Sequence, residues 1–161
     1  MIVGLISDTH GLLRPEAISA LRGVDRILHA GDIGGREVLD GLAVIAPIEA
    51  VRGNNDRDAW GRTLPEVLER ELGGVRVRMI HDRKELGDTR GINVVISGHS
   101  HRPSIKTVGG VLYVNPGSAG PRRFSLPVAV GVLTINRGRA RAEIITLDVT
   151  VKLGARKKAR A

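Results

Sequence analysis

Residues 1–10 read MIVGLISDTH. The first seven residues alternate loosely and include several β-branched side chains, a pattern that predicts a buried β-strand. A polar turn with Asp8 and His10 follows this run directly. We therefore expect the strand to place an aspartate and a histidine at its carboxyl end.

The next residues alternate between helical and strand patterns. Segments 16–22 and 36–42 have the spacing of helices with one apolar face, whereas the short segments 26–30 and 47–51 have the composition of strands. The order strand, helix, strand, helix, strand predicts a parallel sheet with helices packed on it.

The second half of the sequence consists mainly of strands joined by tight turns. Period-two alternation surrounds Gly73–Gly74 and Gly109–Gly110, and a third hairpin is expected to turn at residues 136–139. An apolar strand is expected at 93–97. Many strands and few helices predict an α/β (α+β) fold in which two packed sheets are flanked by helices.

Length and composition indicate one globular domain. The chain has 161 residues, of which 42% are apolar and 26% charged, and residues 1–150 are expected to form a single domain. We interpret residues 151–161 as a basic, flexible tail that contributes five charges to the net charge of +8. The absence of cysteine excludes disulfides and thiolate zinc sites.

The sequence also bears on location and partners. No segment has the length of a signal sequence or of a membrane span, so we expect a cytoplasmic protein with no membrane contact. The positive charge leaves binding to nucleic acid open, although no base-reading motif supports it.

Five successive elements end in turns that carry aspartate, asparagine or histidine. Asp and Asn are ordinary turn formers, which explains each turn taken singly. Together, however, the turns contain two Asp, one Asn and four of the five histidines, which are typical ligands of two divalent cations that share one bridging carboxylate. The predicted ligands are Asp8, His10, Asp32, Asn54, His81, His99 and His101.

The motifs DTH (8–10), GD (31–32), GNND (53–56) and GHSH (98–101) resemble those of the calcineurin-like metallophosphoesterase superfamily. The short length and the later VNPGS (114–118) make the chain most similar to its small bacterial and archaeal phosphodiesterase branch. The resemblance covers about residues 1–150. It implies a four-layer αββα fold, in which a two-sheet sandwich flanked by helices carries a dinuclear metal centre.

The resemblance also implies a role for each predicted ligand. The first metal would take Asp8, His10, Asp32 and His101. The second metal would take Asp32, Asn54, His81 and His99. Asp32, Asn54 and His99 would then be the catalytic positions of the centre, with Asp32 as the bridge. The oxygen and imidazole donors make manganese the first candidate, with iron, cobalt, nickel and zinc as alternatives.

Two features depart from the family pattern. Many relatives have a histidine where this chain has Asn55, which is expected to face the substrate but cannot donate a proton by ionising. Asp82 follows His81 where a glycine is common, and the segment 82–93 is short for a substrate-covering loop.

Neighbouring polar residues are expected to have supporting roles. His29 is interpreted as a buried histidine behind the ligands, and Asp56 as a residue that holds a loop or orients a ligand. Arg52 and Arg57 could meet a phosphate, but arginine is abundant in this chain, so they are interpreted as solvated surface. Residues 115–118 are interpreted as a turn near the site.

The expected function is therefore hydrolysis of a small phosphodiester, by in-line attack of a hydroxide that bridges the two metals. One alternative is a nuclease of the same fold, supported only by the basic charge. Another is a non-catalytic protein-interaction module, because a retromer subunit shares this fold. The presence of all seven ligands favours the enzyme.

Overall fold

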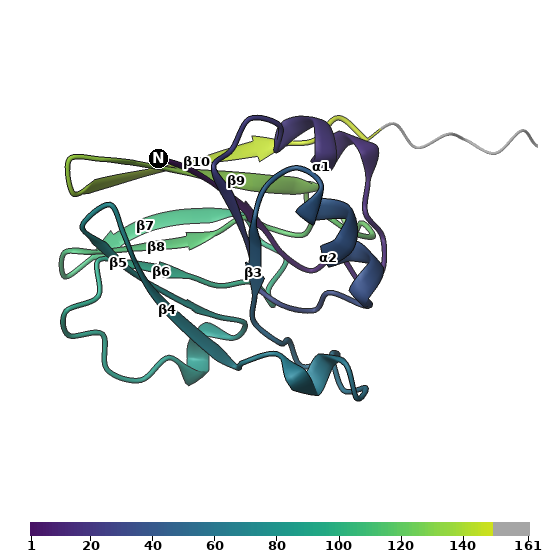
Figure 1. The fold of residues 1–161 in the computed structure, drawn as a ribbon, viewed down its shortest axis with the longest axis horizontal. Helices are drawn as coiled ribbons and strands as arrows, with labels where there is room; N and C mark the ends of the chain where they lie inside the picture. Colours follow the sequence, from purple (N-terminus) through teal and green to yellow (C-terminus); the bar gives the residue numbers. More distant parts are fainter. Residues whose placement is uncertain (150–161) are drawn as a thin grey trace, which may run out of the picture.

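The computed structural model describes residues 1–149, in which two five-stranded sheets pack face to face (Figure 1). The first sheet has the order β10 (Arg139–Thr146), β9 (Ala129–Asn136), β1 (Ile2–Ile6), β2 (Arg26–His29) and β3 (Ile48–Ala50). The second has the order β4 (Val67–Leu72), β5 (Val75–Ile80), β6 (Val94–Ile96), β8 (Val111–Asn115) and β7 (Ser104–Val108). The helices are α1 (Pro15–Ala20) and α2 (Arg36–Ala43), with 3₁₀ turns η1 (Gly61–Thr63) and η2 (Arg83–Glu85).

The first sheet confirms the predicted parallel arrangement. β1 pairs in parallel with β2, and β2 with β3, while α1 and α2 form the crossovers. β9 runs antiparallel to β1 on its other side, so β1 lies in the middle of the sheet. The carboxyl ends of β1, β2 and β3 therefore lie at one edge of the sheet.

The three predicted hairpins are also present, as β4–β5, β7–β8 and β9–β10. β6 pairs in parallel with both β5 and β8. The second sheet is therefore mixed. Because β5 and β6 are parallel, their carboxyl ends lie at one edge of this sheet.

Period-two alternation in β1 divides its side chains between two apolar cores. Val3 and Leu5 pack in the core that joins the two sheets, together with Leu28 and Met79. Ile6 belongs to the second core, which lies between the first sheet and the helices. Each fully buried side chain of this kind contributes about 1.5–3 kcal/mol through removal of apolar surface from water.

The four-layer αββα arrangement is only partly formed. In the described residues, both α-helices pack on the first sheet (Figure 1). The outer face of the second sheet carries a small cluster around Val95 and Tyr113 instead of a helical layer. The reason lies in the connection from Ile80 to Val94, which is short, is interrupted by Gly87 and Gly91, and forms only η2. The expected second outer layer is therefore wrong, and the fold is an α/β sandwich with few helices.

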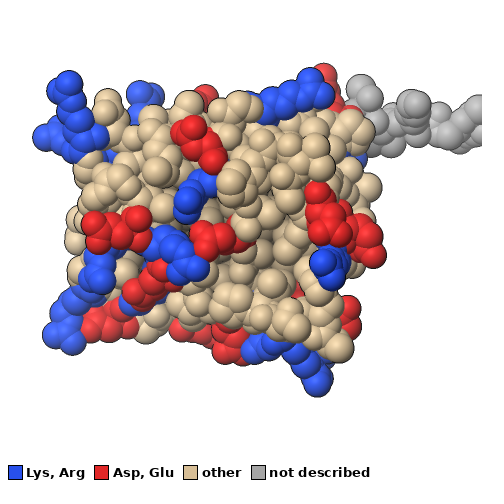
Figure 2. Space-filling view, in the orientation of Figure 1, with Lys and Arg blue, Asp and Glu red and all other residues tan. Residues whose placement is uncertain are grey.

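Figure 2 shows acidic and basic side chains interspersed on one face of the molecule. Several charged side chains of the first and second sheets form ion pairs. Arg26 and Arg70 both pair with Glu49, and Arg78 pairs with Glu69. The opposite charges of this face largely neutralise one another. The predicted tail at 151–161 lies outside the described residues.

Neither α-helix of residues 1–149 is long and apolar enough to cross a membrane.

Candidate metal centre

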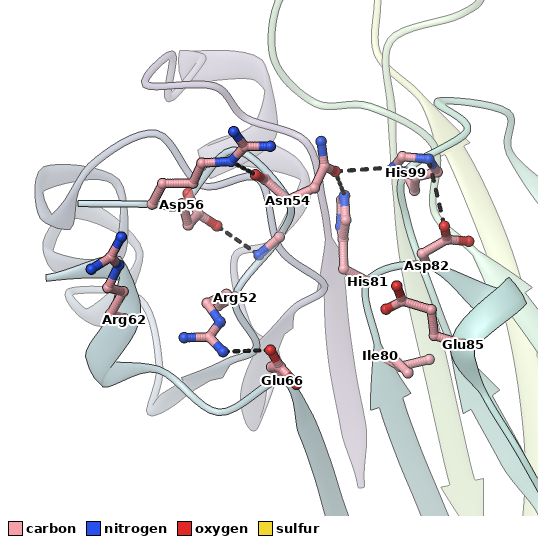
Figure 3. Close-up of a pocket in the computed structure, with 12 residues that line it drawn as sticks. Arg52, Asn54, Asp56, Arg62, Glu66, Ile80, His81, Asp82, Glu85 and His99 are labelled. Atoms are coloured by element: carbon pink, nitrogen blue, oxygen red, sulfur yellow. Dashed lines mark hydrogen bonds and ion pairs between the residues drawn. The ribbon is translucent and has the colours of Figure 1, made fainter. Parts of the chain in front are cut away.

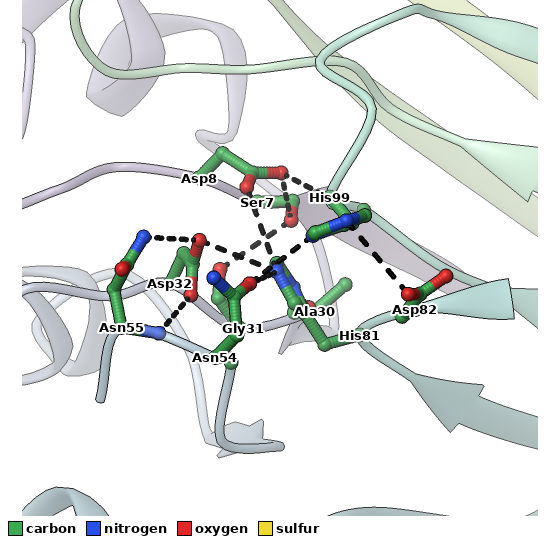
Figure 4. Close-up of polar contacts among 12 residues, drawn as sticks. Ser7, Asp8, Ala30, Gly31, Asp32, Asn54, Asn55, His81, Asp82 and His99 are labelled. Atoms are coloured by element: carbon green, nitrogen blue, oxygen red, sulfur yellow. Dashed lines mark hydrogen bonds and ion pairs between the residues drawn. The ribbon is translucent and has the colours of Figure 1, made fainter. Parts of the chain in front are cut away.

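The structure brings all seven predicted ligands together around one space where the two sheets meet. Asp8, His10, Asp32 and Asn54 follow β1, β2 and β3, while His81, His99 and His101 follow β5 and β6. Figure 4 shows the side chains of Asp8, Asp32, Asn54, His81 and His99 pointing toward one another from these separate loops. The turns after five strands thus bring the predicted side chains into one space.

Five of these residues adopt an unusual backbone conformation. Asp8, His10, Asp32, His99 and His101 have φ between 45° and 70°, in the left-handed region. Each costs roughly 1–2 kcal/mol relative to ordinary backbone, although Asp and His tolerate it better than most residues. The sharp turn at each position directs the side chain back into the shared space. The backbone of these loops is therefore strained, and this conformation brings the side-chain donors together.

The first group of donors consists of Asp8, His10 and His101. Asp8 Oδ1 lies 3.3 Å from His101 Nε2 and 3.9 Å from His10 Nε2, and the two imidazole rings stack with centroids 5.4 Å apart. These three residues place ligand atoms within 4.8 Å of one another, the arrangement needed to hold one cation.

The second group consists of Asp8, Asp32 and His81, which meet the same criterion. His81 Nε2 lies 3.3 Å from Asp32 Oδ2 and 3.0 Å from Asn54 Oδ1. Asn54 Oδ1 also lies 3.1 Å from His99 Nδ1, which brings the remaining two predicted ligands to this group.

Two carboxylates lie between the groups. Asp8 belongs to both, and Asp32 Oδ2 lies 3.3 Å from His81 Nε2 and 3.8 Å from His10 Nε2. The resemblance implied Asp32 alone as the bridge. The geometry gives a central position to Asp8 as well.

The residues present fit divalent cations. Asp8 Oδ1, His10 Nε2 and His101 Nδ1 are buried and have no hydrogen-bond partner among the described residues. A buried polar atom without a partner costs about 1–3 kcal/mol, which a bound cation would offset for Asp8 Oδ1 and His10 Nε2. The donors are oxygen and imidazole nitrogen, the set that suits first-row divalent metals.

Electrostatics keeps Asp32 ionised. Burial opposes its charge, but a hydrogen bond with His81 and the main-chain N–H of Asn55 outweigh burial and lower the pKa of Asp32 to about 2. His81 responds in the opposite sense: burial opposes its charge, yet Asp32 and Asp8 raise its pKa. Its Nδ1 lies 2.7 Å from the carbonyl oxygen of Ala30, which fixes the ring and directs Nε2 at the carboxylates.

His29 supports two ligand turns from behind, as the sequence predicted. Thr9 Oγ1 donates to the carbonyl of Ile33, so it accepts the Nε2 proton of His29 at 2.9 Å. The N–H of Gly31 donates to His29 Nδ1 at 3.2 Å. These partners require the neutral ring protonated on Nε2. Burial accordingly lowers the pKa of His29 to about 4.

Asp56 holds the loop that follows β3. Its carboxylate accepts the main-chain N–H groups of Ile33, Gly34 and Gly53, with the shortest bond 2.8 Å from Gly53. The loop after β2 and the loop after β3 are therefore tied together. Of the two roles that the sequence left open for Asp56, the structure supports the first.

Two glycines that precede ligand residues are required by close packing. A Cβ at Gly53 would overlap both Oδ1 and the main-chain nitrogen of Asp32. A Cβ at Gly98 would overlap Ser7 Oγ and approach Asp8 Oδ2. The glycines thus let neighbouring loops approach closely enough to share ligands, beyond their ordinary use in turns.

A pocket of about 440 Å³ opens beside Asn54, His81 and His99 (Figure 3). Its lining includes Arg52 and Arg62. Sequence reasoning did not identify Arg62, because no motif surrounds it. Only the packing of η1 beside the loop after β3 brings it to the site.

Comparisons with known proteins agree with this geometry. The family model for the calcineurin-like phosphoesterase superfamily domain matches residues 1–138. A probable metallophosphoesterase of Methanothermobacter thermautotrophicus is 39% identical over 166 residues, covering 94% of this chain and 95% of that protein.

Solved structures show the same fold. A structure described as a novel archaeal phosphodiesterase has a TM-score of 0.74 and 25% identity, covering 90% of this chain and 100% of that one. Vps29 of Chaetomium thermophilum has a TM-score of 0.74 at 17% identity, with coverage of 91% and 97%. The latter likeness concerns the fold alone.

Proposed function

This chain belongs to the calcineurin-like phosphoesterase superfamily, and we propose that it hydrolyses phosphodiesters with a dinuclear metal centre. One observation carries the proposal. Two buried carboxylates, Asp8 and Asp32, lie between two sets of imidazoles, and two atoms that face this space, Asp8 Oδ1 and His10 Nε2, have no hydrogen-bond partner among residues 1–149. Buried ligand atoms without a partner would not contribute to binding another protein at the surface. They therefore support the enzyme over the interaction module.

The ligands divide into two sites in this proposal. Asp8, His10, Asp32 and His101 would hold one cation, and Asp32, Asn54, His81 and His99 the other. Bound cations would polarise the phosphate as Lewis acids and lower the pKa of a water that attacks phosphorus in line. Manganese is the first candidate by donor type, with iron, cobalt, nickel or zinc as the alternatives to be tested.

The chain's own residues orient the substrate. Asn54 and the half-exposed His99 lie at the solvent side of the centre and also line the adjoining pocket. A phosphate reaching the centre would pass these two residues first. Asp32, held by Asn55 and His81, would keep its negative charge throughout the working pH range. We therefore propose Asp32, Asn54 and His99 as the residues closest to the reacting phosphate.

A diester is the favoured substrate class. The solved archaeal structure, similar over almost the whole chain, is described as a phosphodiesterase, and it supports this choice by analogy. The ion-paired face described above gives no support to a nuclease reading.

The test combines metal content with activity. We expect about two metals per chain at saturation, and faster hydrolysis of bis(p-nitrophenyl) phosphate than of p-nitrophenyl phosphate. Asp32→Asn should lower both metal content and turnover, while Asp40→Asn, an exposed change on α2, should alter neither. One metal at saturation, or full turnover in Asp32→Asn, would contradict the dinuclear proposal.

A further inference from the structure

The pocket beside the metal centre has a basic wall. Arg52, Arg57 and Arg62 line it and come from the single segment between β3 and β4. Asp82 and Glu85 line it from the η2 side, and Figure 3 shows them across the pocket from Arg52 and Arg62. Asp56 and Glu66 of the same segment also line the pocket, but Asp56 accepts main-chain N–H groups and Glu66 pairs with Arg52.

Two of the three arginines are free to meet a ligand. Arg52 is held by an ion pair with Glu66 at 2.5 Å. Neither Arg57 nor Arg62 has a carboxylate within 4.0 Å among residues 1–149. Arg57 Nε donates to the main-chain carbonyl of Asn54 at 2.8 Å, which anchors the side chain and leaves its terminal nitrogens available.

The loop that carries these arginines is held by hydrogen bonds within the protein. Asp56 ties its beginning to the loop after β2 through main-chain N–H groups. Asp58 Oδ1 accepts the N–H of Gly61 at 2.7 Å and begins η1. A Cβ at Gly61 would press on the main chain of Asp56, so this glycine lets η1 pack close to the site. These contacts place Arg62 beside the pocket.

Arg57 also contacts a residue of the proposed metal centre. Its anchor is the carbonyl of Asn54, whose side chain is a proposed ligand of the second cation. A substrate whose reacting phosphate contacts Asn54 and His99 would extend its other groups along this wall. Guanidinium groups bind phosphate through paired, charge-assisted hydrogen bonds.

We propose that this pocket binds a second phosphate of the substrate, so that the enzyme prefers diesters carrying an additional phosphomonoester. The inference rests on the proposed phosphodiesterase activity, because it concerns the substrate of the same site. Asp82 and Glu85 would repel an anion on their side, which directs the second phosphate toward Arg57 and Arg62.

The test uses two substrates that differ by one group. Thymidine 5′-(p-nitrophenyl phosphate) is compared with the same compound bearing a 3′-phosphate. We expect the wild type to have a kcat/KM roughly 10- to 100-fold higher for the 3′-phosphorylated ester, the range expected for hydrogen bonds to a charged group. Arg62→Gln should reduce this preference, mainly through KM, and leave the unphosphorylated ester nearly unchanged. Arg57→Gln should reduce the preference as well, and should also slow the unphosphorylated ester, because it removes the bond to the carbonyl of Asn54.

The control removes the same charge elsewhere. Arg139 lies at the turn between β9 and β10, and the end of β9 at this turn pairs with the amino end of β1. Arg139→Gln therefore changes the edge of the sheet opposite to the metal centre. It should keep the full preference. No preference in the wild type, or equal losses for both esters in the arginine variants, would overturn the proposal.

A binding measurement separates this inference from the proposed function. Calorimetry on metal-free protein compares thymidine 3′,5′-bisphosphate with thymidine 5′-monophosphate. The wild type should bind the bisphosphate more tightly than the monophosphate, and Arg57→Gln should abolish this difference. Such a result would support the phosphate pocket even if neither ester is hydrolysed. In that case only the phosphodiesterase proposal would fail. Equal affinities for the two nucleotides would overturn the pocket even if both esters are hydrolysed.

Discussion

Asn55 holds both carboxylate oxygens of Asp32. Its main-chain N–H donates to Oδ1 at 2.9 Å, and its side-chain amide donates to Oδ2 at 3.0 Å (Figure 4). The sequence predicted that this exposed residue would face the substrate. In the structure its amide is engaged with a proposed ligand, so its first role is to orient Asp32.

The first prediction concerns that orientation. Asn55→Ala removes the bond to Oδ2 but keeps the main-chain bond, so metal affinity should fall by about 10- to 100-fold, as is typical for groups that orient a ligand. Asn55→Asp should lower it as well, because a second negative charge would face Asp32 in place of a donor. Calorimetric titration with manganese measures both. Unchanged affinity in Asn55→Ala would show that the amide has no orienting role.

The second prediction concerns the leaving group. Because Asn55 cannot donate a proton by ionising, wild-type rates should depend steeply on leaving-group pKa, with nitrophenyl esters fast and alkyl esters slow. Asn55→His should raise kcat/KM for poor leaving groups and flatten the dependence, by up to the factor of about 10²–10⁴ that a well-placed general acid supplies.

A series of substituted phenyl and alkyl diesters, measured on both proteins, tests this expectation. The metal content of Asn55→His serves as the control, since the substitution also removes the amide that orients Asp32. A wild type insensitive to leaving-group pKa would mean that another group donates the proton.

The third prediction follows from the neutral ring of His29. Its pKa is about 4 in the folded protein, because burial outweighs the opposing effect of Asp8 and Asp56, and is near 6.5 when unfolded. Between these values the unfolded state binds more protons, so the free energy of unfolding falls as pH decreases from 6.5 toward 4. The loss from this residue is on the order of 3 kcal/mol.

Urea unfolding of metal-free protein at pH 7 and pH 4.5 measures this loss. His29→Gln should be less stable than wild type at pH 7, because it disturbs the bonds to Thr9 and Gly31, yet it should lose less stability on acidification. All other side chains are the same in both proteins, so the difference between the two profiles isolates His29. Parallel pH profiles would refute the assignment.

The fourth prediction concerns close packing at Gly53. A methyl group there would meet the main chain of Asp32, which cannot rotate away, so Gly53→Ala should separate the two loops. We expect destabilisation of about 1–3 kcal/mol together with loss of metal binding. Gly41→Ala is the matched control: on α2 the methyl meets only the end of the Leu13 side chain, and alanine favours the helix. Normal metal binding by Gly53→Ala would contradict this reading of the packing.

The predictable features of this protein are those that repeat along the chain. Alternation identified the strands, and the parallel order of β1 and β2 placed Asp8 and Asp32 at one edge before any contact was known. The missing helical layer was not predictable from pattern alone, because it depends on how the short connection before β6 folds. Arg62 was missed for a related reason: its place depends on the packing of η1.

The central position of β1 has a consequence for how the protein is made. Asp8 and His10 directly follow β1, yet one of the two neighbours of β1 in the sheet is β9, more than a hundred residues later. During synthesis β1 leaves the ribosome long before β9 exists, so one edge of β1 stays unpaired until most of the chain has emerged. Contacts this distant in sequence also slow folding. The seven predicted ligands all lie within residues 8–101, so every one of them has been made before β1 gains its second neighbour in the sheet.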